Sequence, residues 1–451
     1  MPVRKRTGGD VLAETLVALG ARTVFGPLAL GPFEAVGRAR VRYVDGPDAA
    51  FIADGHARTT GEVTPLLLPG VDPVLRPGSP VLVVAVRRAP EGVEHVEVVA
   101  HAEEIPAALA RAWDVAATAP FEPVWVEVPE TVLTGRTSAP EVEPIVSCPE
   151  SVVPRPEAVE AAAKLLDDAR RPVVVAGGGV VRGDARAELL ALAEKLRAPV
   201  VTTFGGKGAF PWDHELSAQS WLSDEHTTRF LEDADLLLVV GSGLDAPRDN
   251  VVRIDVDARK VDDRGVHGEA RFALADLAEA VTPRAPGPAE AAVLDLLAAV
   301  RKPEPALDAI RAAVPDDSPT FWDRTVFGER PWLAWDARTA AMHGTPEGVG
   351  YALPAAVGAA VALGDHVPVL AVAGGDDVPL GLRALATARR HDLRVTWLVV
   401  DGEPDLLGIA HALGVPAVAT TPETLRGDLA EALAWIGPHV VVLTSPTVTP
   451  K

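Results

Sequence analysis

Five carboxylate side chains follow two apolar segments near the carboxyl end of this chain. Asp376 and Asp377 come after VPVLAVAGG, and Asp401, Glu403 and Asp405 come after RVTWLVV. Both apolar segments are predicted to be parallel strands, so their carboxyl ends lie at one edge of a sheet, where α/β proteins usually hold ligands. Hard divalent cations prefer carboxylate oxygens. The pattern therefore allows a metal site, although a solvated acidic loop would have the same composition.

Other reactive side chains do not form a catalytic pattern. Cys148 is the single cysteine, so the chain has no intrachain disulfide and no cysteine-based metal cluster. The histidines are scattered, and the closest pair in the first block, His95 and His101, has no metal-type partner nearby in sequence. Ser242 in GSGLD lacks the pattern of a nucleophile elbow.

Two Pro-rich segments, 138–156 and 282–288, divide the sequence into three blocks. Each block alternates strand and helix signals, which is typical of parallel sheets flanked by helices. We therefore predict an α/β protein of three domains, covering residues 1–137, 150–284 and 300–451.

Individual elements can be assigned within these blocks. The first block contains a predicted helix at Gly9–Leu19, a strand at Thr23–Phe25 and a second helix at Ala49–Arg58. In the middle block the buried strand in Pro172–Gly179 enters a glycine turn. That turn lacks the spacing of the dinucleotide fingerprint, so an empty structural domain is expected there. A further helix is predicted through Gly350–Leu363.

The charge and hydropathy of the chain exclude several classes of partner. The net charge of −21 argues against nucleic acids and anionic membranes, because both require a basic face. No run reaches the ~18–20 apolar residues of a membrane span. The basic start MPVRKR lacks the apolar region of a signal peptide, so a cytoplasmic location is expected.

Segments in all three blocks resemble thiamine diphosphate (ThDP) enzymes, and acetolactate synthase in particular. The resemblance is carried by seven segments: TGGDVLAETLVALGARTVFG, AAFIADGHARTTG, RPVVVAGGGVVRG, TTFGGKGAFPWDH, LLLVVGSGLD, GVGYALPAAVGAAVAL and LRALATARRHDLRVTWLVV. It implies a pyrimidine-binding domain, a central Rossmann-like domain and a pyrophosphate-binding domain. It also implies a homodimer or homotetramer, since the family builds its active sites between two subunits.

The family activates ThDP with a glutamate that protonates the pyrimidine ring. In this sequence the matching position, just before the segment AAFIADGHAR, is Gly46, which cannot carry a proton. Asp45 and Asp48 flank it in the turn-like sequence DGPD. We interpret both as solvated turn residues, because acid–base catalysis requires hydrogen-bond geometry that a displaced, shorter carboxylate would not reach.

The family binds its Mg²⁺ through an aspartate and an asparagine after two strands. Aligned on the segment ALATA, these positions fall on Gly375 and on the pair Asp401 and Gly402. A shift of one residue would make Asp376, Asp401 and Glu403 the metal ligands. Asp376 and Asp377 would then lie against the diphosphate of ThDP, which they would repel unless a metal ion neutralised them.

Two segments of the family pattern are also missing, one after Gly61 and one after Gly402, and both form walls of the same site. The leading hypothesis is therefore a catalytically inactive family member, a pseudoenzyme that serves assembly or regulation, either alone or in a hetero-oligomer with an intact ThDP enzyme. One alternative is an active ThDP- and Mg²⁺-dependent lyase or carboligase acting on 2-oxo acids. Another is a cleft rebuilt to bind a different ligand or a partner subunit.

Overall fold

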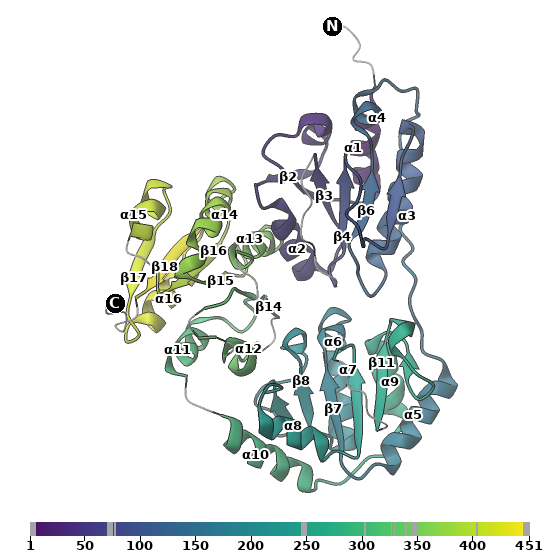
Figure 1. Ribbon diagram of the computed structural model, residues 1–451, viewed down its shortest axis with the longest axis vertical. Coiled ribbons are helices and arrows are strands. Elements are labelled where there is room, and N and C mark those ends of the chain that lie inside the picture. The colour runs from purple at the N-terminus through teal and green to yellow at the C-terminus, as the bar shows by residue number, and fades with distance from the viewer. Residues whose placement is uncertain are drawn as a thin grey trace.

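The computed structural model describes residues 6–69, 75, 78–244, 250–301, 304–325, 327–328, 330–338, 341–344, 350–402 and 405–444. Three six-stranded parallel sheets follow one another along the chain, each flanked by helices (Figure 1). Their strands are nearly continuous apolar runs, because a parallel sheet covered on both faces buries both sets of side chains. The predicted three-domain α/β class is confirmed, while the three predicted domain ranges stay predictions.

The N-terminal domain holds the first sheet, with strand order β2-β1-β3-β4-β6-β5. The predicted helices and the first strand are present within one or two residues of their expected ends. The elements are α1 (Gly8–Ala18), β1 (Thr23–Gly26), β2 (Arg42–Asp45), α2 (Ala49–Thr60), β3 (Thr64–Leu68), β4 (Val81–Ala85), β5 (Val96–Val98), α3 (Ile105–Ala117), β6 (Val124–Glu127) and α4 (Glu130–Thr134).

The central domain has the strand order β12-β11-β10-β7-β8-β9, which is the order of a Rossmann fold. Its elements are α5 (Pro156–Asp168), β7 (Pro172–Ala176), α6 (Gly178–Arg182), α7 (Arg186–Leu196), β8 (Val200–Thr202), β9 (Ser217–Gln219), α8 (Glu225–Glu232), β10 (Leu236–Val240), β11 (Val251–Asp255), β12 (Val266–His267) and α9 (Ala270–Ala280). Helix α10 (Pro288–Val300) leads to the last domain.

The C-terminal domain repeats the topology of the first, with strand order β14-β13-β15-β16-β18-β17. Its elements are α11 (Pro305–Ala313), β13 (Thr320–Trp322), α12 (Arg330–Ala334), β14 (Met342–Gly344), α13 (Ala352–Leu363), β15 (Val369–Gly374), α14 (Val378–Arg390), β16 (Val395–Val400), α15 (Asp405–Ala412), β17 (Ala417–Thr420), α16 (Leu425–Ala434) and β18 (His439–Leu443). No helix among the described residues is long and apolar enough to cross a membrane.

The first and last domains meet through helices α2 and α13, which lie side by side at their junction (Figure 1). Their backbones approach closely because each helix presents a glycine at the contact. A Cβ on Gly55 would lie 1.9 Å from the carbonyl oxygen of Ala355, and one on Gly358 would lie 1.8 Å from that of Ile52. The helix pair therefore requires glycine at both positions.

A buried polar contact also joins these two helices. Asp54, which is 2% exposed, accepts hydrogen bonds from the Tyr351 hydroxyl and from Arg58 Nε, both at 2.7 Å. The buried carboxylate is thus compensated by a charge-assisted bond within its own helix and a hydroxyl from the other domain.

Lys207 ties the central domain to the C-terminal domain. Its side chain is 2% exposed, and its ammonium donates to Ser220 Oγ at 2.5 Å and to the carbonyl oxygen of Trp335 at 2.9 Å. The ammonium also lies 5.0 Å from the ring centroid of Trp212. Burial lowers the pKa of Lys207 well below its usual value, so the surrounding acceptors are what make this buried amine tolerable.

Candidate functional site

Gly46 lies at the end of β2, in a loop that packs against helix α14 of the C-terminal domain. It is buried, and its backbone N–H donates to the carbonyl oxygen of Gly26 at 3.0 Å. A Cβ at this position would lie 3.0 Å from both Ile52 Cδ1 and Thr387 Oγ1. The position expected from the resemblance to hold a glutamate therefore has no proton donor, and a side chain there would displace Ile52 and Thr387.

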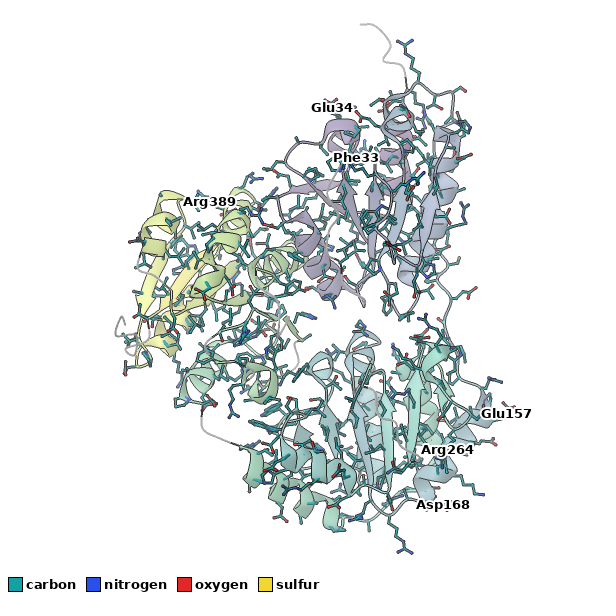
Figure 2. All side chains as sticks on the ribbon, viewed as in Figure 1. Phe33, Glu34, Glu157, Asp168, Arg264 and Arg389 are labelled. Carbon is teal, nitrogen blue, oxygen red and sulfur yellow. The ribbon has the colours of Figure 1, made fainter. Side chains whose placement is uncertain are left out.

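The two aspartates beside Gly46 are ion-paired to α14 and its C-cap. Asp45 pairs with Arg390 and accepts from His391 Nε2 at 3.0 Å, and Asp48 pairs with Arg383 at 2.6 Å. The side chain of Asp45 is 20% exposed and that of Asp48 is 10% exposed. Figure 2 shows side chains crossing from α14 toward the N-terminal domain.

The interpretation of Asp45 and Asp48 as solvated turn residues is therefore wrong. The sequence DGPD has the composition of a turn, but it does not reveal that a basic helix end from a distant domain packs over it. Burial raises the pKa of Asp48, and the Arg383 guanidinium opposes that rise. Both carboxylates hold two domains together, so neither is positioned as a free acid.

The second candidate region is the loop between β15 and α14, at the carboxyl edge of the C-terminal sheet. Gly375 begins a 3₁₀ turn at Gly375–Asp377, and a Cβ added to it would lie 2.3 Å from the carbonyl oxygen of Asp401. Any side chain at residue 375 would therefore require the backbone of the neighbouring loop to move.

The two adjacent aspartates of this loop differ in environment. Asp377 is 4% exposed, and its carboxylate accepts the N–H of Gly374 at 3.3 Å. Burial, reinforced by the charge of Asp376, raises the pKa of Asp377. The chain thus places its own carboxylate on a backbone amide of this turn.

Asp401 lies across this loop, at the end of β16, with a positive φ of 54°. Its Oδ1 atom is buried and has no hydrogen-bond partner in the described part of the chain, which is the one feature here that favours a cation. Among the described residues, no group of three or more His, Cys, Asp or Glu side chains could hold a metal ion. Glu403 lies outside the described residues, so the Asp376, Asp401 and Glu403 site stays a prediction.

Asp323, which follows β13, is a functional candidate that the sequence did not reveal. Its carboxylate accepts the N–H groups of Gly350, Tyr351 and Ala352 at 3.0–3.1 Å, and so caps the N-terminus of α13. Burial, with a further contribution from Asp377, outweighs these amides and raises its pKa to about 7. The residue precedes the helix by almost thirty positions, too far for a local capping signal.

The central domain has its own cavity of about 240 Å³ at the point where the strand order reverses, between β7 and β10. Gly179, Gly241, Ser242, Asp255 and Lys260 are among its lining residues. A Cβ on Gly177 would lie 2.3 Å from the carbonyl oxygen of Gly241, so these turns need glycine for backbone packing alone. The expectation that this domain is empty stays a prediction.

Comparison with known proteins identifies the architecture. Residues 159–280 match the central domain of thiamine pyrophosphate enzymes, and residues 332–403 match their C-terminal TPP binding domain. The chain therefore contains the central and C-terminal domains of thiamine pyrophosphate enzymes. This confirms the resemblance seen in the sequence, including its likeness to acetolactate synthase.

Individual family members align over most of the chain. It is 28% identical over 427 residues to an acetolactate synthase large subunit of Parasynechococcus marenigrum, covering 77% of this chain and 67% of that protein. It is 29% identical over 470 residues to a probable 2-ketoarginine decarboxylase of Pseudomonas aeruginosa, covering 86% of this chain and 80% of that protein. The structure of benzoylformate decarboxylase from Polynucleobacter necessarius matches the fold of this chain with a TM-score of 0.81 and 17% sequence identity. The match covers 99% of this chain and 100% of that one.

The residues present do not fit ThDP and Mg²⁺ held in the family's manner. Gly46 offers no acid to the pyrimidine ring, and Gly375 offers no ligand to the metal ion. A Cβ at Gly46 would press against two side-chain ends, and a Cβ at Gly375 would overlap a backbone oxygen. We therefore derive no catalytic step through this cofactor.

Proposed function

We propose that this chain is a non-catalytic member of the thiamine pyrophosphate enzyme family that keeps the fold for assembly or regulation. One observation carries the proposal: the positions of the family's two essential acids are glycines packed against neighbouring atoms. A Cβ at Gly46 would be 3.0 Å from Thr387 Oγ1, and one at Gly375 would be 2.3 Å from a backbone oxygen. The framework around these positions is intact, with fully buried cores in all three domains.

Cofactor binding tests this proposal directly. Isothermal titration calorimetry of the full chain with ThDP and MgCl₂ is expected to show no binding in the micromolar range. An intact acetolactate synthase large subunit, titrated under the same conditions, is the positive control. Micromolar binding by this chain, or ThDP-dependent turnover of pyruvate or another 2-oxo acid, would contradict the proposal and support the active lyase.

The buried Oδ1 of Asp401 is the observation that favours a metal-binding alternative. Titration with MgCl₂ or MnCl₂ alone, in the wild type and in Asp401→Asn, separates the two proposals. We expect no saturable binding in either protein. Saturable binding that disappears in Asp401→Asn would support a rearranged metal site.

An assembly role requires that the chain bind a partner, and we propose two kinds of assembly. One is a homodimer or homotetramer of this chain, and the other is a complex with an intact family member. Light scattering of the purified chain measures the first. Co-purification from the native host, with mass spectrometry directed at ThDP-enzyme sequences, measures the second. A monomer without such a partner would leave regulation by ligand as the remaining role. The expected cytoplasmic location stays a prediction that fractionation of the host would check.

A further inference from the structure

A cavity of about 460 Å³ lies where the three domains meet. The N-terminal domain contributes the end of α2 and residues 78 and 80, and the central domain contributes α6 and Gly205. The C-terminal domain contributes Ala341, which precedes β14, and the first two residues of that strand. Pro319 and Leu363 of the same domain also line the cavity. Its volume is within the usual range of small-molecule sites.

The cavity is separate from the candidate cofactor region. Residues Pro319 and Ala341 precede β13 and β14, so the cavity lies at the amino ends of the C-terminal strands. Gly375 and Asp401 follow β15 and β16, at the opposite, carboxyl edge of the same sheet. A ligand here would therefore bind whether or not the chain binds ThDP, and the inference does not rest on the proposed function.

Arg182, at the end of α6, is the distinctive charged group of the cavity. Its guanidinium lies against two glycines of different domains: a Cβ on Gly78 would be 3.2 Å from its Cζ, and one on Gly178 would be 2.7 Å from Nη1. Within the described part of the chain it makes no ion pair or side-chain hydrogen bond. Burial and the charge of Arg58 both lower the pKa of Arg182.

The other two guanidinium groups that line the cavity are already engaged. Arg58 Nε donates to Asp54 at 2.7 Å. Arg186 Nε donates to the carbonyl oxygen of Gly208 at 2.8 Å, and its Nη1 lies 3.4 Å from Asp184. The charges of Asp255 and Glu122 act on Arg182 from a distance and favour its charged form. Arg182 is exposed and makes no ion pair or side-chain hydrogen bond in the described part of the chain, so its guanidinium is available to an anion.

His343 supplies a second polar group. Its ring lies 5.1 Å from that of Phe321, and burial, together with the charges of Arg58 and Arg182, lowers its pKa to about 3. The imidazole is thus neutral at physiological pH and offers one donor and one acceptor without adding charge. Asp317 also lines the cavity and is exposed.

Apolar side chains complete the walls. They come from all three domains and include Ala57, Pro80, Phe121, Val181, Met342 and Leu363. A free inorganic ion would leave these walls in contact with water, whereas a ligand with an apolar body would bury them. The lining therefore combines the guanidinium of Arg182 and the neutral imidazole of His343 with apolar walls, while the carboxylates of Asp184 and Asp317 also line the cavity.

We propose that this cavity binds a small organic anion, a carboxylate or phosphate monoester with an apolar body, anchored by Arg182. Because the site is built from three domains, such a ligand stabilises the arrangement in which the three are in contact.

Calorimetry on the full chain with benzoate and with phenyl phosphate tests the proposal and distinguishes the two anion classes. We expect one site per chain for at least one probe, with affinity lowered about tenfold or more in Arg182→Gln, since a charge-assisted bidentate contact is lost. Arg229→Gln removes a surface guanidinium that pairs with Glu225 on α8, and is the matched control. Equal binding by wild type and Arg182→Gln, or no binding of either probe, would overturn the proposal.

Two further variants test whether the probes bind in this cavity and not in the neighbouring one. Arg182 lines the neighbouring central-domain cavity as well as this one, whereas Lys260 lines only the central-domain cavity. Lys260→Gln is therefore expected to bind the probes normally, and parallel losses in Lys260→Gln and Arg182→Gln would place the site in that other cavity. If Arg182→Gln does not fold, Arg182→Lys replaces it and must still weaken binding of phenyl phosphate, because lysine lacks the planar fork.

The pKa of His343, measured by NMR, reports on anion binding in this cavity independently of the measured affinity. A bound anion favours the protonated imidazole and should raise the pKa of His343. NMR titration of the histidine ring protons, with His343→Gln to assign the signal, is expected to show this rise in the wild type and not in Arg182→Gln. An unchanged His343 signal on saturation with the probe would place the bound anion elsewhere.

Discussion

At the scale of single residues, Gly46 and Gly375 are confined by different kinds of neighbour. The atoms nearest to a Cβ on Gly46 are the ends of the Ile52 and Thr387 side chains, which can rotate away. The atom nearest to a Cβ on Gly375 is a backbone carbonyl oxygen, which moves only with its loop. A substitution is therefore costly at the first position and structurally disruptive at the second.

We predict that Gly46→Glu lowers the free energy of unfolding by about 1–3 kcal/mol, the usual range for overpacking a buried position. It is expected to give no ThDP-dependent activity, since the metal position remains a glycine. Urea denaturation and a pyruvate-consumption assay measure the two outcomes. Gly427→Glu is the control, because Gly427 is exposed on α16 with no atom within 4 Å of its Cβ.

Asp323 predicts a dependence of stability on pH. Its pKa is about 7 in the folded chain, against 3.8 for an aspartate freely exposed to water, so folding favours its protonated form. The stability from this group is fully present below pH 3.8 and is lost as the pH rises through about 7, by an amount of the order of a few kcal/mol. We expect the difference in unfolding free energy between wild type and Asp323→Asn to fall over that interval; a constant difference would contradict the assignment.

At the scale of elements, the close contact of α2 and α13 is specified by one glycine in each helix. We predict that Gly55→Ala and Gly358→Ala each destabilise the chain by more than about 3 kcal/mol, because a backbone oxygen occupies the site of the new methyl group. Thermal and urea denaturation measure the loss.

Gly408→Ala provides the matched control for these two substitutions. Gly408 also lies in a helix, α15, but no atom is within 4 Å of its Cβ. There the exchange should stabilise the chain by about 0.5–1 kcal/mol, the helix propensity difference between alanine and glycine. Equal effects at Gly358 and Gly408 would contradict the packing argument.

The sequence predicts those elements that carry a clear periodicity and end in a recognisable turn. The helix at Gly8–Ala18 and the strand at Pro172–Ala176 are examples. The sequence does not predict strand β2. The strand is short, and its last residue, Asp45, begins the segment DGPD, which has the composition of a turn. The pairing of Asp45 with Arg390 spans 345 positions, so no local pattern contains it.

The candidate site was predictable to a different extent. Gly46 and Gly375 could be located because neighbouring segments align with a known family. The Asp323 cap and the Arg182 cavity could not, since each depends on how distant segments pack. A sequence identifies which residue types are present, whereas the enclosure that changes their chemistry belongs to the tertiary structure.

At the scale of the whole molecule, Lys207 couples the central and C-terminal domains. We predict that Lys207→Met destabilises the chain by about 1–3 kcal/mol, because the Trp335 carbonyl oxygen loses its hydrogen-bond donor. Calorimetric unfolding should then resolve the two domains into separate transitions. Lys164→Met, at an exposed position on α5, should leave both the stability and the shape of the transition unchanged.

The contact between Gly375 and the Asp401 carbonyl oxygen has a consequence for the history of this protein. A side chain introduced at residue 375 is accommodated only if the loop after β16 moves with it. The two loops are therefore expected to change together during evolution, because a single exchange at residue 375 carries a steric cost that a paired change in the second loop would relieve.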